Sequence, residues 1–133
     1  MTLNEEDILI SGTLMKAMGR EGHLETDAQH LTCFIGGLLA IAGKIFQQEE
    51  DVKDGSKLAA GCVWGYRSTV TGIMPETFTA LACTNRTACP WDENTWRQAI
   101  APASSDQEAR NKINQERLPP GFTHIQDRRY LLR

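Results

Sequence analysis

The sequence lacks an excess of charge of either sign. Its 133 residues carry 14 Lys and Arg against 17 Asp and Glu, a formal net charge of −3, and the two signs are interspersed. A nucleic-acid-binding protein needs a basic face for phosphates, and a protein that binds anionic membranes needs one for lipid headgroups. The composition therefore favours neither nucleic acid nor a membrane surface as a partner.

Long apolar runs are also missing. No stretch approaches the roughly 18 apolar residues that span a bilayer, and the chain opens with TLNEEDILI instead of a basic segment followed by an apolar one. We expect neither a transmembrane segment nor a signal peptide in this chain. The apolar content of 41% is near the globular average, so one domain with a buried core is feasible.

The cysteine pattern excludes the common zinc modules. The four cysteines are Cys33, Cys62, Cys83 and Cys89. They form no C-x-x-C pair, and no histidine pair stands near them at zinc spacing, so disulfides are the better interpretation. Residues 85–87 read NRT, an acceptor sequence for glycosylation of Asn85. That motif fits a secretory route, although three residues also match by chance.

Apolar residues at steps of three and four predict a first helix. They are Leu31, Phe34, Ile35, Leu38, Ala42, Ile45 and Phe46. Thr26 followed by Gln29 has the form of a capping box, so we expect this helix to begin near Asp27. Gly36 and Gly37 each cost about 1 kcal/mol relative to Ala in an exposed helix, which indicates a compensating close approach of another backbone or a ligand.

The same spacing predicts a second helix. Its apolar residues are Leu58, Ala59, Cys62, Val63, Tyr66 and Val70. Ser56 resembles an N-cap, but a bridge between Cys33 and Cys62 would need both cysteines equally far from the turn between antiparallel helices. Cys33 lies about 20 Å from the end of the first helix, and a start near Glu50 puts Cys62 about 17 Å along the second. We therefore expect this helix to begin before Gly55.

Beyond the helical pair the chain is expected to be less regular. Gly72 is the predicted C-terminal stop of the second helix, Pro75 prevents its continuation, and residues 77–79 alternate as an extended segment does. Asp92 is the expected N-cap of a short helix that carries Trp96.

The two ends of the chain give weaker signals. Residues 7–14 and the segment after them predict a strand, a loop and a strand. Residues 101–120 are polar and predict a surface segment with one loose helical stretch, for which Ser105 and Glu108 have the form of a capping box.

Few side chains stand out as chemical candidates. His30 lies beside the first apolar stripe, where an ordinary hydrogen-bonded role near a helix end is the alternative to function. Glu76 follows Pro75 in a segment expected to be half-buried, where a carboxylate must be paired or perform work, the alternative being a solvated side chain. Further candidates are Arg67, Arg128, Arg129, Arg133, Trp64, Trp91 and Trp96. These residues alone define no reaction.

Four separated segments, in order, add a resemblance. They are QHLTCFIGGLLAIAGKIF, KLAAGCVWGYRSTVTGIMPETF, CPWDENTW and LPPGFTHIQDRRYLLR. Together they resemble the class I α-1,2-mannosidases, glycoside hydrolase family forty-seven, especially the fungal members. The resemblance implies that residues 1–133 are a partial catalytic domain, mainly α, forming an incomplete section of an (α/α)7 barrel with short β hairpin segments. The implied activity is inverting, Ca²⁺-dependent trimming of α-1,2-linked mannose from N-glycans in the endoplasmic reticulum, the Golgi or outside the cell.

The resemblance also assigns roles to single residues. Cys33 and Cys62 fall where the family places its characteristic disulfide. His30 matches a histidine that lines the mannose subsite, and Glu76 matches a pocket carboxylate that is a candidate proton donor. Arg133 matches the arginine that opens an Arg-Pro-Glu motif.

The remaining cysteines have their own expected pairing. Cys83 and Cys89 are six residues apart around the glycosylation motif, and their pairing would leave no odd thiol in a secretory protein.

The resemblance predicts an incomplete site. Inverting hydrolysis needs an acid and a second carboxylate roughly 6.5–9.5 Å apart. By comparison with the family pattern, the chain ends one Pro before the Glu of the base region, begins after an upstream Glu and Asp, and lacks the late Thr that binds Ca²⁺. We expect an interior fragment with no Ca²⁺ ligand of its own, whose partners are the remainder of the barrel and a high-mannose N-glycan. A non-catalytic fragment that binds glycan or a partner is the alternative.

Overall fold

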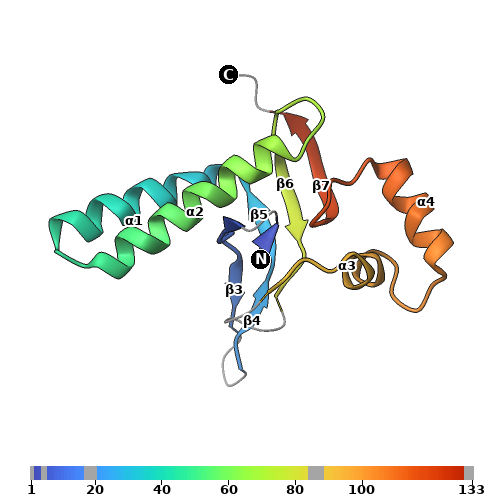
Figure 1. Ribbon diagram of the computed structural model, residues 1–133, viewed down its shortest axis with the longest axis horizontal. Helices are drawn as coiled ribbons and strands as arrows, with labels where there is room; N and C mark the ends of the chain where they lie inside the picture. The colour runs from blue at the N-terminus through green and yellow to red at the C-terminus, as the bar shows by residue number, and fades with distance from the viewer. Residues whose placement is uncertain (1, 4–5, 17–20, 84–88, 131–133) are drawn as a thin grey trace.

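The computed structural model describes residues 2–3, 6–16, 21–83 and 89–130 (Figure 1). Its elements are β1 (Thr2–Leu3), β2 (Glu6–Asp7), β3 (Thr13–Met15), β4 (His23–Glu25), β5 (Asp27–Gln29), the 3₁₀ turn η1 (His30–Thr32), α1 (Cys33–Ile45), α2 (Glu49–Arg67), β6 (Pro75–Ala80), α3 (Glu93–Ile100), α4 (Asp106–Glu116) and β7 (Phe122–Tyr130). The α1–α2 hairpin projects from one side of a central sheet, and α3 and α4 lie on the other side.

The central sheet is antiparallel, in the order β5-β6-β7. In its register Ala28 faces Phe78 and Gln29 faces Thr77 on one side of β6, while Phe78 faces Ile125 on the other. The extended segment predicted at residues 77–79 is therefore confirmed as part of β6. Two separate hairpins, β1–β2 and β3–β4, precede the sheet. The predicted strand, loop and strand correspond to β3 and β4, but the strand expected over residues 7–14 is wrong for residues 8–12, which lie in no strand.

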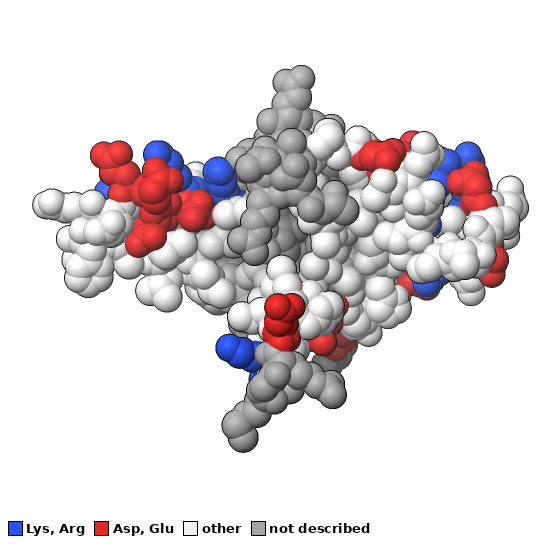
Figure 2. Space-filling model, turned by 90° about the horizontal axis from the view of Figure 1, so that it is seen from below, with Lys and Arg blue, Asp and Glu red and all other residues white. Residues whose placement is uncertain are grey.

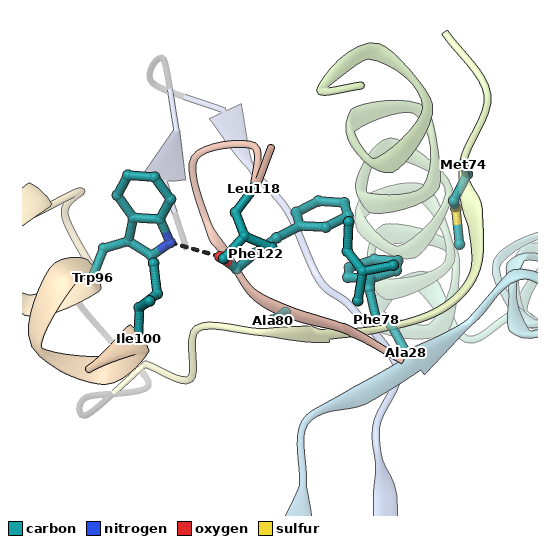
Figure 3. Packing of buried hydrophobic residues seen from close by; sticks show 9 residues of the cluster. Ala28, Met74, Phe78, Ala80, Trp96, Ile100, Leu118 and Phe122 are labelled. Carbon is teal, nitrogen blue, oxygen red and sulfur yellow. Dashed lines mark hydrogen bonds between the residues drawn. The ribbon is translucent and has the colours of Figure 1, made fainter. Parts of the chain in front are cut away.

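The core lies between the sheet, α2 and α3 (Figure 3). The rings of Phe78 and Phe122 stack with centroids 4.0 Å apart, and Trp64 of α2 tilts against Phe122 at 5.1 Å. From the other side, the indole Nε1–H of Trp96 donates to the backbone carbonyl of Phe122 at 2.8 Å. Both phenylalanines are almost fully buried, so this cluster joins the two sides of the molecule.

The large apolar side chains of α1 do not enter this core. Phe34 is 77% exposed, Leu38 69% and Ile45 68%. The face of α1 that meets α2 is built from small residues: a Cβ atom on Gly36 would lie 2.8 Å from the backbone N of Ala59. The close backbone approach expected at Gly36 is confirmed.

One boundary prediction and one packing prediction for the first helix are wrong. The helix expected to begin near Asp27 is absent there, and residues Asp27–Gln29 form β5. The Thr26 hydroxyl donates to the carbonyl of Ala80 at 2.8 Å instead of capping a helix. The backbone N–H of Ala80 in turn donates to the carbonyl of Thr26. The expected close approach at Gly37 is also absent, since a Cβ atom there would meet nothing within 4 Å.

The limits of α2 follow the prediction at one end only. It begins at Glu49, before Gly55, as expected, and Ser56 lies inside it. It ends at Arg67, five positions before the predicted stop at Gly72, because the Thr69 hydroxyl contacts the carbonyls of Tyr66 and Ile73 and turns the chain.

The caps predicted for the last two helices are confirmed. Asp92 Oδ1 accepts from the backbone N–H of Asn94 at 3.0 Å at the start of α3. Ser105 Oγ accepts from the N–H of Glu108 at 3.3 Å at the start of α4. The polar segment forms a surface helix of 11 residues, anchored by the buried Ala109.

The two adjacent glycines of α1 give a matched test. Replacing Gly36 with Ala should lower the free energy of unfolding by about 1–3 kcal/mol, because the new methyl group meets rigid backbone atoms of α2. Replacing Gly37 with Ala should raise it by up to about 1 kcal/mol, because that position is open and Ala is the better helix former. Urea unfolding followed by far-UV circular dichroism measures both, and equal stabilities for the two variants would contradict the packing described here.

Candidate functional site

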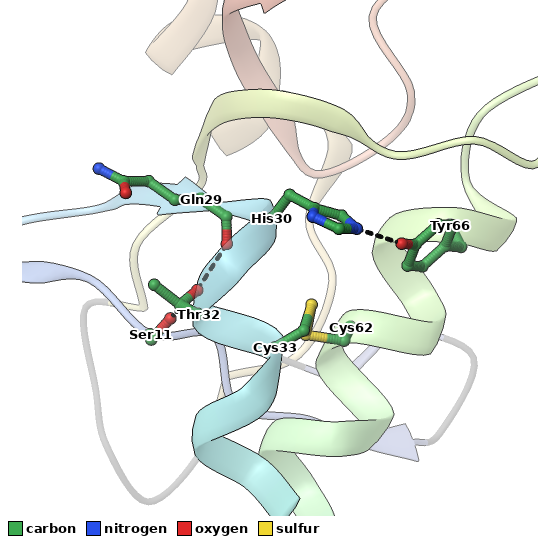
Figure 4. The surroundings of a disulfide bond; sticks show 7 residues. All are labelled: Ser11, Gln29, His30, Thr32, Cys33, Cys62 and Tyr66. Carbon is green, nitrogen blue, oxygen red and sulfur yellow. Dashed lines mark hydrogen bonds between the residues drawn. A yellow bond between two sulfur atoms is a disulfide. The ribbon is translucent and has the colours of Figure 1, made fainter. Parts of the chain in front are cut away.

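His30 is held where the central sheet passes into the helical hairpin (Figure 4). It is the first residue of η1, directly after β5. Its Nε2 atom hydrogen-bonds the hydroxyl of Tyr66 in α2, and the two rings meet edge to face with centroids 5.8 Å apart. The histidine is half-buried.

Glu76 lies at the same end of the β5–β6 strand pair as His30. The last paired residues of β5 and β6 are Gln29 and Thr77, and His30 follows Gln29 while Glu76 precedes Thr77. Both side chains carry a buried atom with no hydrogen-bond partner among the described residues, Nδ1 of the histidine and Oε2 of the glutamate. Buried polar atoms are rarely left unpaired, so these two point to a missing ligand or water.

A disulfide fixes the approach of η1 to α2. Cys33 and Cys62 are bridged with Cα atoms 5.7 Å apart, as predicted. Cys33 is three residues after His30 and Cys62 is four before Tyr66, so the bridge lies about one turn from the His30–Tyr66 contact in both elements.

Hydrogen bonds hold the turn itself. The Thr32 hydroxyl donates to the carbonyl of Gln29 at 2.6 Å, and Ser11 donates to the Thr32 hydroxyl at 2.6 Å. These bonds join η1 to the segment between β2 and β3, so the position of His30 is determined by three parts of the chain.

The other predicted residues differ in their outcome. Cys83 and Cys89 form the expected second disulfide, with Cα atoms 5.6 Å apart. Asn85 and Arg133 lie outside the described residues, so their predicted roles stay predictions. Arg67 is exposed at the end of α2.

Sequence reasoning did not select Tyr66 as a site residue. It appeared only as one apolar position of the second helix. The available signal was its spacing: a residue four places after Cys62 lies on the same helix face, and therefore beside whatever precedes Cys33.

A hollow between α3 and α4 carries no candidate chemistry. Its volume is about 770 Å³. Arg97 in its wall contacts Glu93 and bonds Asp106 at 3.2 Å. A hydrogen bond from Arg110, together with its charge, holds the pKa of Asp106 below the ordinary value. These charges already satisfy one another.

The described residues hold neither a metal-binding cluster nor a membrane-spanning helix. No group of three or more His, Cys, Asp or Glu in this part of the chain could hold a metal ion. Among the same residues, no helix combines the length and the apolar character needed to cross a membrane. On the face drawn in Figure 2, acidic and basic side chains are mixed at both ends of the molecule, and the described residues form no continuous basic patch there.

The class of protein follows from comparison with known sequences. The sequence model for glycosyl hydrolase family 47 matches residues 1–133. The chain therefore belongs to glycosyl hydrolase family 47, an (α/α)7 barrel family, as the resemblance of its four segments implied. The helices and small antiparallel sheets described above fit a section of such a protein.

The curated relatives are fungal enzymes. Over 66 residues the chain is 41% identical to the mannosyl-oligosaccharide alpha-1,2-mannosidase 1B of Emericella nidulans, a match that covers 50% of this chain and 13% of the relative. It is 42% identical over 57 residues to the probable enzyme of the same name in Aspergillus niger and to that of Aspergillus phoenicis, covering 43% of this chain and 11% of each relative. The chain thus matches about one eighth of the length of these relatives.

The two disulfides should contribute unequally to stability. Replacing Cys33 and Cys62 with Ser should lower the free energy of unfolding by about 3–4 kcal/mol, because a loop of 29 residues is freed in the unfolded state. The matched control, Ser at Cys83 and Cys89, frees a separation of only six residues and should cost about 2 kcal/mol. Denaturant unfolding of the oxidised chains measures both, and a larger loss for the control pair would contradict this assignment.

Proposed function

We propose that this chain is part of the catalytic domain of an α-1,2-mannosidase that removes α-1,2-linked mannose from high-mannose N-glycans. The observation that carries the proposal is the presence of His30 and Glu76 at one end of the β5–β6 strand pair, each with a buried unpaired polar atom. Sugar hydroxyls both donate and accept hydrogen bonds, so they can satisfy an imidazole nitrogen and a carboxyl group. Family membership and the names of the fungal relatives support the choice of sugar.

The chemistry assigns Glu76 the role of general acid. In an inverting hydrolase one carboxylic acid protonates the leaving oxygen and a second carboxylate activates water from the opposite side of the sugar. We assign His30 and Arg133 to substrate binding. The second carboxylate would come from the longer protein, because the resemblance assigns it to no residue of this chain.

Calcium is part of the proposal only for the whole protein. The described residues offer no cluster that fits the ion, so its ligands would lie elsewhere and no step is assigned to it here. When bound in the family it would hold sugar hydroxyls in place.

The exposed face of α1 supports assignment to a larger barrel. Seven long apolar side chains are more than 40% exposed along η1, α1 and the residue after it: Leu31, Phe34, Ile35, Leu38, Ile41, Ile45 and Phe46. A contiguous apolar surface of this kind is typical of an interface. We propose that further helices of the barrel cover it. The two disulfides and the acceptor sequence at Asn85 support a secretory location.

The alternative is a non-catalytic fragment that binds glycan or a partner. The small share of the relatives' length that the chain matches favours it for the 133-residue chain taken alone.

The isolated chain should therefore lack mannosidase activity. Oxidised residues 1–133, supplied with Ca²⁺ and an α-1,2-linked mannobiose, should release no mannose above the blank, because the resemblance assigns the second carboxylate to no residue of this chain and acid catalysis alone contributes only about 10²–10⁴-fold. Mannose release that disappears on Glu76→Gln would show that both catalytic groups lie within this chain.

A chimera tests the role of Glu76 where the rest of a barrel is present. Residues 26–80 of this chain would replace the corresponding segment of the Emericella nidulans relative. In an active chimera, Glu76→Gln should lower kcat about 10²–10⁴-fold. The control Glu50→Gln changes a fully exposed carboxylate and should leave kcat unchanged. An unchanged kcat for Glu76→Gln would overturn the assignment.

A further inference from the structure

We propose that Tyr66 is a positioning residue that sets the tautomer of His30. Its hydroxyl donates to Nε2 of the imidazole, so that the ring proton resides on Nδ1. The His30–Tyr66 contact and the buried, unpaired Nδ1 atom carry this inference.

The direction of the hydrogen bond follows from acidity. A phenol has a pKa of about 10, whereas the N–H of a neutral imidazole is a far weaker acid and its bare nitrogen is a good base. The bond is therefore stronger when the Tyr66 O–H donates to Nε2 than when the imidazole donates to the phenol oxygen. In a neutral histidine the nitrogen that accepts leaves the proton on the other nitrogen.

The contact is fixed by structure around it. Tyr66 is one turn after Cys62 in α2, and His30 is one turn before Cys33, so the disulfide holds the two rings at their edge-to-face distance of 5.8 Å. On the sheet side, β5 fixes His30 through its pairing with β6. The hydroxyl thus meets Nε2 without any rearrangement.

The tautomer decides what the site offers a ligand. With the proton on Nδ1, His30 presents a buried donor to a ligand. The oxygen of a sugar hydroxyl can accept from this donor, and the hydroxyl proton stays available for another acceptor. The opposite tautomer would present an acceptor at Nδ1 and would take up that proton. This last step rests on the proposed function, whereas the tautomer itself does not.

Nitrogen-15 NMR of the ligand-free, oxidised chain tests the tautomer. At about pH 8, where imidazoles are neutral, the His30 ring should show a protonated Nδ1 and an unprotonated Nε2, the reverse of the form that free histidine prefers. Tyr66→Phe should shift both resonances toward the Nε2-protonated form. The exposed His23 serves as an internal reference and should not change. A wild-type His30 protonated on Nε2, or identical shifts in Tyr66→Phe, would overturn the proposal.

A second measurement keeps the hydroxyl of Tyr66 and changes only its acidity. The chain contains two tyrosines, so Tyr130→Phe makes Tyr66 the only one, and a ring-fluorinated tyrosine can then be incorporated at that position. The fluorinated phenol is more acidic, so it should donate a stronger hydrogen bond to Nε2. The Nε2 resonance should then move further away from its position in Tyr66→Phe. An unmoved Nε2 resonance would mean that the hydroxyl does not donate.

The chimera separates this proposal from the proposed function. If the chimera is active, Tyr66→Phe should lower kcat/KM about five- to tenfold, the effect of one hydrogen bond of about 1 kcal/mol. A tautomer that depends on Tyr66 in an inactive chimera would support the positioning role and count against the function. An active chimera with kcat/KM unchanged by Tyr66→Phe would overturn the positioning role.

Discussion

The stacking of Phe78 on Phe122 beneath Trp64 is the interaction on which the rest of the structure depends. It joins β6 to β7 and presses α2 against the sheet, and Gly65 of α2 comes so close that a Cβ atom there would lie 3.0 Å from the sulfur of Met74. The residue after Gly65 is Tyr66, so the same contact that buries the aromatic rings determines where the tyrosine meets His30. The packing of the core therefore also positions the candidate site.

The two helices of the α1–α2 hairpin pack through small residues. The large apolar residues of α1 face outward, and Gly36 of α1 lies against Gly55 of α2, so that the two backbones approach closely there. Only small residues permit such a close approach of two backbones. As a result, this interface buries few large side chains. The outward stripe is then available for other helices, an arrangement that suits a family built from concentric helix pairs.

The candidate site is assembled from three elements that are distant in the chain. η1 supplies His30, α2 supplies Tyr66 and β6 supplies Glu76. The residues are held by different means: a disulfide, a strand register and an aromatic core. Each of these means is independent of a bound ligand, so the polar atoms can be positioned before a ligand binds. The proposed function would depend on such preorganisation, because it lowers the cost of stabilising a transition state.

What the sequence determined by itself was local. The caps Asp92 and Ser105 accept hydrogen bonds from backbone N–H groups two or three residues away. The pairing of Cys33 with Cys62 agrees with their similar distances from the turn between two helices, which the helical rise per residue predicts. Tertiary structure decided the rest. Thr26 caps no helix because it pairs with Ala80, 54 positions away. The Thr26 hydroxyl donates to the carbonyl of Ala80, and the backbone N–H of Ala80 donates to the carbonyl of Thr26. The apolar period of α1 indicated one apolar face but not whether that face is buried within this chain. The spacing of Tyr66 from Cys62 indicates a position beside η1, but only the tertiary structure shows that its hydroxyl meets the ring of His30.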